Sequence, residues 1–153
     1  MAIHRMKYRD RPQLAEPLGV ALAAFVLHGD SPIAPKAIDC IMPVPMTPGR
    51  QRVRGYNQAE RIARVVAREL ELEIDTRTLI RQRNVRPQVG LTRAARQQNL
   101  AGVFKVRDRN VVTNRSILVM DDVTTTGSTL HETASTLKSA GAVAVYGLTL
   151  AAG

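Results

Sequence analysis

The residues with the clearest chemical potential lie between Ile117 and Thr129, where two adjacent acids precede a loop of hydroxyl residues. Backbone N–H groups at a helix N-terminus, together with hydroxyl groups, form a cradle suited to a phosphate. Two carboxylates beside such a cradle would repel a bare polyphosphate, but they accept hydrogen bonds from a sugar diol. The chemistry therefore points to a ribose 5-phosphate, and the candidate residues are the acids Asp121 and Asp122 with the loop residues Thr124, Thr125, Thr126, Gly127, Ser128 and Thr129.

These residues need a strand before them and a helix after them. The stretch 117–120 is a continuous apolar run, which is typical of an interior strand of a parallel sheet. Open α/β sheets bind their ligands at the carboxyl ends of the strands, where the acid pair emerges. Gly127 gives the backbone freedom to turn, and we expect a helix to begin near Ser128. A strand that ends in a plain turn explains neither the doubled acid nor the threonine run.

Missing motifs exclude other classes of protein. The chain contains neither a G-x-x-x-x-G-K-[ST] phosphate loop nor a G-x-G-x-x-G dinucleotide fingerprint. A single cysteine, Cys40, can form no internal disulfide and no zinc site, and its position in an expected strand predicts a buried, inert thiol. The sequence has no apolar run of about 18 residues and no secretory leader, so no membrane contact and a cytoplasmic location are expected.

Length and charge set further bounds. Residues 1–153 are expected to form a single domain with an aliphatic core, because only 3% of the residues are aromatic. The formal net charge is +9, and the stretch 50–96 holds twelve arginines, five acids and no lysine. Because the planar guanidinium group suits bidentate phosphate binding, this block fits pyrophosphate, nucleic acid or both. The alternative is that these arginines form a solvent-exposed surface without a ligand.

Periodicity places the remaining elements. Helices are expected at 12–27, from Asn57 to about Leu70, and at 130–140, and strands at 38–43, 76–80, 103–106, 117–120 and 143–150. The stretches 45–55 and 82–98 are expected to be loops. Asn57 and Glu60 fit a capping box. This alternation predicts an α/β fold with a mainly parallel sheet and helices on both faces.

Two of the expected helices have a readable apolar face. In the first, the core positions are Leu14, Leu18, Ala21, Leu22 and Val26. In the second, they are Ala59, Ile62, Ala63, Val66, Ala67 and Leu70, and an opposite stripe is formed by Arg61, Arg64 and Arg68.

The run 117–129 resembles the phosphoribosyl pyrophosphate (PRPP) signature of type I phosphoribosyltransferases: four hydrophobic residues, Asp-Asp, a hydrophobic residue and Thr-Thr-Gly-x-Thr. Three further segments resemble the ComF/GntX family of predicted amidophosphoribosyltransferase-like proteins, and they are 44–60, 81–104 with Pro87, Gln88, Arg96 and Asn99, and His4 to Tyr8. The chain departs from that family in one respect, because it lacks the four cysteines of the usual N-terminal zinc ribbon.

The resemblance implies the type I phosphoribosyltransferase fold, a mainly parallel central sheet with helices on both faces and a mobile loop over the site. It implies that Asp121 and Asp122 contact the ribose hydroxyls, and that the loop 124–129 holds the 5-phosphate. Pyrophosphate would be bound by the segment 45–55, through Thr47, Arg50, Arg52 and Arg54. The mobile loop, at about 82–100, would contribute Arg83, Arg86, Arg93 and Arg96. Mg²⁺ would arrive on PRPP, and no catalytic or metal-ligating residue is assigned.

Two functions stay open. The first is Mg²⁺-dependent transfer of a phosphoribosyl group to an unidentified acceptor with release of pyrophosphate, in a protein resembling the ComF competence proteins. The second is a non-catalytic accessory protein of DNA uptake or transformation that senses PRPP or binds DNA through its basic surface. Without a helix-turn-helix signature or stacked aromatic residues, any DNA contact would be made to the backbone. A homodimer is left open.

Overall fold

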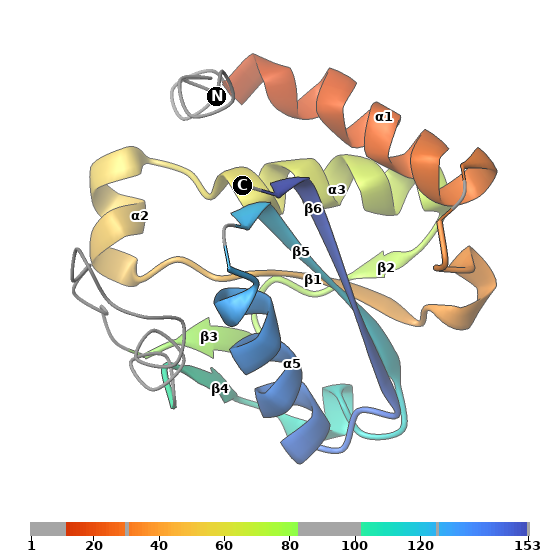
Figure 1. Ribbon diagram of the computed structural model, residues 1–153. Helices are drawn as coiled ribbons and strands as arrows, with labels where there is room; N and C mark the ends of the chain where they lie inside the picture. Colours follow the sequence, from red (N-terminus) through yellow and green to blue (C-terminus); the bar gives the residue numbers. More distant parts are fainter. Residues whose placement is uncertain (1–11, 30, 83–101, 125, 153) are drawn as a thin grey trace.

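The computed structural model describes residues 12–29, 31–82, 102–124 and 126–152 (Figure 1). Their strands form a four-stranded parallel sheet of order β2-β1-β5-β6 and a two-stranded antiparallel sheet of β3 and β4. The parallel sheet consists of β1 (Cys40–Pro43), β2 (Glu73–Ile74), β5 (Ser116–Thr124) and β6 (Ala144–Ala152), and the small sheet of β3 (Leu79–Arg81) and β4 (Phe104–Val106).

Strand β5 lies inside the parallel sheet, as its apolar run predicts. Ile117 pairs with Cys40 of β1 on one side and with Val145 of β6 on the other. The four residues 117–120 are buried. The strand continues beyond them to Thr124, because Asp121 still pairs with Thr149 of β6. The acid pair is therefore part of the strand and does not begin the loop.

Helices cover both faces of the parallel sheet, which confirms the expected architecture (Figure 1). One face carries α3 (Gln58–Leu70), with α1 (Ala15–His28) packed on it, and the other carries α5 (Ser128–Ser139) and the small sheet. Successive side chains of a strand point to opposite faces. Leu118 and Met120 of β5 accordingly join the cluster beneath α1 and α3, which we call the α3 cluster. Ile117 and Val119 join the cluster beneath α5, β3 and β4, which we call the α5 cluster.

The two helices of the first face differ in how well their periodicity predicts burial. All six expected core residues of α3 are buried, and its arginine stripe is exposed. In α1, by contrast, Ala21 is exposed, and the buried residues are Ala15, Gly19, Ala23 and Val26. Because α1 is apolar on every side, its pattern does not indicate which face packs.

The segment 45–55 is not the expected loop, because Pro48–Arg54 forms a helix, α2. The Thr47 side chain caps it by accepting a hydrogen bond from the Arg50 amide at 3.4 Å, and Pro48 occupies the first helical position. Gly55 ends the helix with a φ of 77°. Thr47, Pro48 and Gly55 are ordinary signals for the start and end of a helix. The segment was predicted to be a loop because glycine and proline are also frequent in loops.

Two other expectations need correction. The strand expected at 76–80 is β3, which pairs antiparallel with β4 outside the main sheet, and the two-residue strand β2 was not expected. Asn57 does cap α3, because its side chain accepts from the Ala59 amide at 3.1 Å. The capping box is not completed, because Glu60 accepts hydrogen bonds from the Arg64 side chain instead.

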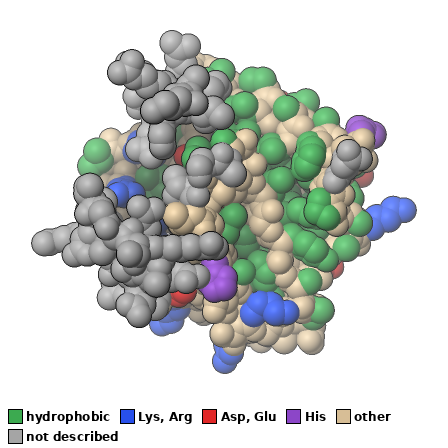
Figure 2. Space-filling model, in the orientation of Figure 1, with side chains coloured by type: hydrophobic (Ala, Val, Ile, Leu, Met, Phe, Trp, Pro, Cys, Tyr) green, Lys and Arg blue, Asp and Glu red, His purple; other side chains and the backbone are tan. Residues whose placement is uncertain are grey.

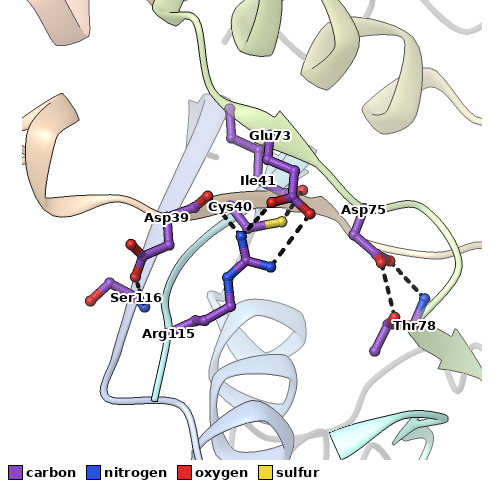
Figure 3. Close-up of polar contacts among 8 residues, drawn as sticks. All are labelled: Asp39, Cys40, Ile41, Glu73, Asp75, Thr78, Arg115 and Ser116. Atoms are coloured by element: carbon purple, nitrogen blue, oxygen red, sulfur yellow. Dashed lines mark hydrogen bonds and ion pairs between the residues drawn. The ribbon is translucent and has the colours of Figure 1, made fainter. Parts of the chain in front are cut away.

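A polar cluster ties the strands together near Cys40 (Figure 3). The Arg115 guanidinium group pairs with Glu73 of β2 and donates to the Asp39 carbonyl at 3.2 Å. The Asp39 carboxylate in turn accepts from the Ser116 amide at 2.7 Å. Cys40 is fully buried, and this burial raises the pKa of its thiol to about 11, in agreement with an inert cysteine. None of the described helices is long and apolar enough to cross a membrane.

Candidate functional site

The acid pair occupies the carboxyl-terminal part of β5, and both side chains are partly buried. Asp121 follows Val119 by two positions, so its Cβ lies on the face of the α5 cluster. Asp122 starts from the opposite face. Each carboxylate accepts a hydrogen bond from the amide of the next residue, from Asp122 at 2.9 Å and from Val123 at 2.8 Å. The two carboxyl groups also interact with each other.

Asp121 sits in an environment that opposes its negative charge. Burial, and then the charge of Asp122, raise the pKa of Asp121 from 3.8 to about 7. The Asp122 amide and the positive charge of Arg81 act in the opposite direction. Near neutral pH, therefore, Asp121 is divided between its protonated and ionised forms, and groups that bring positive charge or hydrogen-bond donors favour the ionised form.

The hydroxyl loop folds back on itself at the start of α5. Gly127 has a φ of 71°, and its amide donates to the Thr124 hydroxyl at 2.9 Å. The hydroxyls of Thr126 and Ser128 are 2.8 Å apart. The His131 amide donates to the Gly127 carbonyl at 2.9 Å, so the amides that precede it belong to the first turn, where a helix offers them no carbonyl. This loop has the donors of an anion cradle, and Thr125 lies outside the described residues.

The segment that connects β1 to α2 begins beside the acid pair. The Val44 amide, directly after β1, donates to the Met120 carbonyl at 2.8 Å, one residue before Asp121. Arg50 and Arg52 of α2 are exposed, and Arg54 is partly buried. Thr47 differs from the expectation in one respect: it is 4% exposed and its hydroxyl caps α2.

One cationic residue of this region, Arg81, was not among the candidates. It ends β3, pairs with Phe104 of β4, and holds its guanidinium carbon 5.5 Å from the centre of the Phe104 ring. Its Nε is buried and has no hydrogen-bond partner. Burial and the charge of Arg50 lower the pKa of Arg81, and the charge of Asp121 opposes this. The signal in the sequence is an arginine that directly follows two apolar strand residues.

The remaining arginine candidates fall into two groups. Arg83, Arg86, Arg93 and Arg96 lie outside the described residues. On α3, Arg64 pairs with Glu60, and Arg68 pairs with Glu16 and Glu69. Arg61 lies over the Tyr56 ring at 4.7 Å. Two of the three stripe arginines, Arg64 and Arg68, are therefore balanced by acids. On the face drawn in Figure 2, the Lys and Arg side chains lie in several separate places. The described part of the chain has no group of three or more His, Cys, Asp or Glu placed to hold a metal ion.

The sequence is similar to one protein family and to several curated proteins. Residues 56–152 match the model of the phosphoribosyl transferase domain family. The DNA utilization protein YhgH of Escherichia coli K12 is 33% identical over 143 residues, which are 94% of this chain and 62% of that protein. Competence protein F of Haemophilus influenzae is 32% identical over 149 residues, 95% of this chain and 65% of that protein. The chain thus spans about three fifths of the length of these curated relatives.

A solved structure shares the fold. The glutamine PRPP amidotransferase of B. subtilis, complexed with ADP and GMP, superposes with a TM-score of 0.59 and 21% sequence identity. The match covers 91% of this chain and 26% of that one. At this identity the likeness concerns the fold, and it agrees with the parallel sheet covered by helices on both faces.

Proposed function

Because this chain belongs to the phosphoribosyl transferase domain family, we propose that it binds PRPP with Mg²⁺ and transfers the phosphoribosyl group to an acceptor, releasing pyrophosphate. The observation that carries this proposal is the arrangement at the carboxyl end of β5. There the carboxylates of Asp121 and Asp122 precede a hydroxyl loop that opens α5. Carboxylates accept hydrogen bonds from a sugar diol, and the loop donates them to a phosphate.

In this reaction no covalent bond forms between the protein and the substrate. As the bond between the ribose C1 and pyrophosphate breaks, positive charge develops on the sugar and negative charge on the leaving group. Positioning and charge stabilisation therefore supply the catalysis. The acid pair holds the ribose, and Arg50, Arg52 and Arg54 on α2 neutralise pyrophosphate. Mg²⁺ belongs to the substrate, which carries it.

Ribose recognition is tested by calorimetric titration with PRPP and Mg²⁺. Replacing both acids, Asp121→Asn with Asp122→Asn, removes two charged acceptors and should weaken binding by a few kcal/mol. A matched control removes two exposed acids of α3 and its end, Glu69→Gln with Glu71→Gln, and should bind as the wild type does. Unchanged affinity of the double aspartate variant would refute ribose recognition by the pair.

Turnover needs a separate experiment. The protein is incubated with PRPP, Mg²⁺ and a panel of ammonia, amines and free bases, and pyrophosphate release is followed. We expect release that depends on an acceptor and disappears in the double aspartate variant. If PRPP binds but no acceptor causes pyrophosphate release, the result would instead support a PRPP-sensing role.

A second function is favoured by the relatives named DNA utilization protein YhgH and competence protein F. We propose that an accessory role in DNA use would involve backbone contacts made by α2, since Arg50 and Arg52 are exposed, whereas Arg64 and Arg68 of α3 are ion-paired. For either function we propose a cytoplasmic location.

The DNA role is tested by titrating duplex DNA at several salt concentrations. Affinity should fall steeply with salt and ignore sequence. The variant Arg50→Gln with Arg52→Gln should bind more weakly and show a smaller salt dependence. The variant Arg64→Gln with Arg68→Gln removes the same charge from α3 and should change little. Equal effects of the two variants would argue against a site on α2.

A further inference from the structure

Strand β6 forms one edge of the parallel sheet, and no strand of the described part of the chain pairs with its outer side. It is 9 residues long, contains neither a charged residue nor a proline, and keeps one register along β5. The opposite edge is different, because β2 has only 2 residues and its Glu73 pairs with Arg115. Short length, charge, proline and bulges keep edge strands from pairing with other chains. The β6 edge has none of these features.

The hydrogen bonds of β5 determine which backbone groups of β6 point outward. The Met120 carbonyl accepts from the Val44 amide on the β1 side. Successive residues of a strand direct their N–H and C=O groups to opposite sides, so Val119 directs its groups to β6. Val119 is paired with Gly147, and in a parallel ladder it bonds to the residues on either side of that partner. The groups of Gly147 therefore point away from the sheet, as do those of its alternate neighbours. We call Val145, Gly147 and Thr149 the open residues of β6.

The open edge is accessible and lies within an apolar surface. Gly147 is exposed, and Val143, directly before β6, is 59% exposed. Tyr146 of β6 and Leu22 of α1 are partly buried against the same cluster. Phe25 follows Leu22 by three positions, on the same side of α1, and is 48% exposed. Figure 2 shows hydrophobic side chains gathered over α1 and β6. Apolar patches of this kind mark contact sites for other macromolecules.

Charge and symmetry favour a second copy of this chain as the partner. The formal net charge of +9 makes two copies repel each other, so an interface between them requires a surface without cations. Strand β6 meets this condition, because none of its 9 residues is charged. Two copies of one strand can pair antiparallel about a twofold axis, and each then supplies the donors and acceptors that the other needs.

We propose that β6 pairs antiparallel with β6 of a second copy of this chain, which joins the two parallel sheets into one continuous sheet. The twofold axis lies at Gly147, the middle one of the open residues. Val145 of one copy then exchanges hydrogen bonds with Thr149 of the other, and Gly147 with its own counterpart. The exposed apolar side chains beside the edge lose contact with water. This pairing does not depend on the binding of PRPP.

The first test measures the molar mass by light scattering over a dilution series from micromolar to millimolar protein. The wild type should change from a monomer to a dimer as the concentration rises. Thr149→Pro removes an outward N–H and therefore two interface hydrogen bonds per dimer, and proline is tolerated at such edge positions. Its dissociation constant should rise about tenfold or more. Thr149→Val keeps the N–H and should dimerise as the wild type does, and circular dichroism checks that both variants fold.

The second test follows amide hydrogen exchange in the wild type, so it decides the proposal even if Thr149→Pro does not fold. The Tyr146 and Leu148 amides bond to β5 and should be protected at every concentration. The amides of the open residues should exchange fast in the monomer and become protected as the dimer forms.

Three results would overturn the proposal. The first is a monomer throughout the dilution series. The second is a dimer that leaves the amides of the open residues in fast exchange, which would place its interface elsewhere. The third is protection of these amides in the dilute monomer, which would mean that another part of the same chain covers the edge.

Discussion

Gly19 of α1 lies directly against Val65 of α3: a Cβ atom added at Gly19 would stand 2.5 Å from the Val65 Cβ. The close approach explains why a glycine occupies the middle of a helix. Gly19→Ala should raise helix propensity by up to about 1 kcal/mol, yet it forces the two helices apart. Overpacking of this kind costs about 1–3 kcal/mol, so we expect a net loss of stability in urea unfolding.

Gly49 of α2 is the matched control for this substitution. No atom lies within 4 Å of the position that its Cβ would take. Gly49→Ala should therefore leave the free energy of unfolding unchanged or raise it by up to about 1 kcal/mol. Equal effects at Gly19 and Gly49 would mean that the contact with Val65 yields easily.

The acid pair should make stability depend on pH. The folded protein holds the Asp121 proton more tightly than the unfolded chain, since the pKa is raised from 3.8 to about 7. The free energy of unfolding therefore falls as pH rises from about 4 to about 7, and this penalty is complete above pH 7. Asp121→Asn removes it, so the variant should be more stable than the wild type at pH 8, by on the order of 2–4 kcal/mol.

The comparison at acidic pH is the control for that prediction. Near pH 4 Asp121 is protonated in the folded protein and resembles asparagine in charge, so the two proteins should differ little. Thermal unfolding scans at pH 4, 6 and 8 measure the difference. A stability gain that is constant over this range would exclude ionisation of Asp121 as its cause.

Gly127 should be required for its backbone conformation and not for space. Its φ of 71° lies in the left-handed region, and no atom lies within 4 Å of the position that a Cβ would take there. Gly127→Ala should lower stability by about 1–2 kcal/mol and weaken ribose 5-phosphate binding, whereas Gly127→Asn should be milder, because asparagine tolerates this region better. Affinity for ribose 5-phosphate, measured by calorimetry, distinguishes the variants; equal losses would point to a steric cause.

The ion pair of Arg115 and Glu73 should contribute more than the pair of Arg68 and Glu16. The Arg115 side chain is 25% exposed and also bonds the Asp39 carbonyl, whereas both members of the second pair are more than half exposed. Double-mutant cycles to alanine should give about 1 kcal/mol of coupling for the first pair and about 0–0.5 kcal/mol for the second. The reverse order would show that burial does not govern these pairs.

Much of the fold could be predicted because its central strand and one helix are unambiguous. The run 117–120 is apolar on both faces, as an interior strand must be, and α3 has a clean division between its buried and arginine faces. The segment 45–55 was misread because glycine and proline mark both loops and helix ends. Strands were expected near β3 and β4, but their antiparallel pairing outside the main sheet could not be inferred, since three-residue strands show too little alternation to reveal their partner.

The site shows the same division. Local signals predict the acid pair and the hydroxyl loop as a candidate site, because these residues are neighbours in the sequence. The surroundings of Arg81 depend on Phe104, 23 positions later in the chain, because its guanidinium group lies over the Phe104 ring. The sequence marks Arg81 only by the two apolar residues before it, and its tertiary neighbour leaves no local pattern. The raised pKa of Asp121 could not be predicted from the sequence either, because its largest cause is the burial of the side chain in the folded protein.

The two hydrophobic clusters share strands β1 and β5 but no residues, and this has a consequence for combining substitutions. A cavity made on one side of the sheet, by Ile62→Val, and one made on the other, by Val112→Ala, remove contacts from different sets of neighbours. Their effects on the free energy of unfolding should therefore add to within about 0.5 kcal/mol. Two cavities in the α5 cluster should depart from this sum, because they relax the same neighbours. Variants in the α3 cluster can thus lower overall stability while leaving the packing of Phe104 beneath Arg81 unaltered.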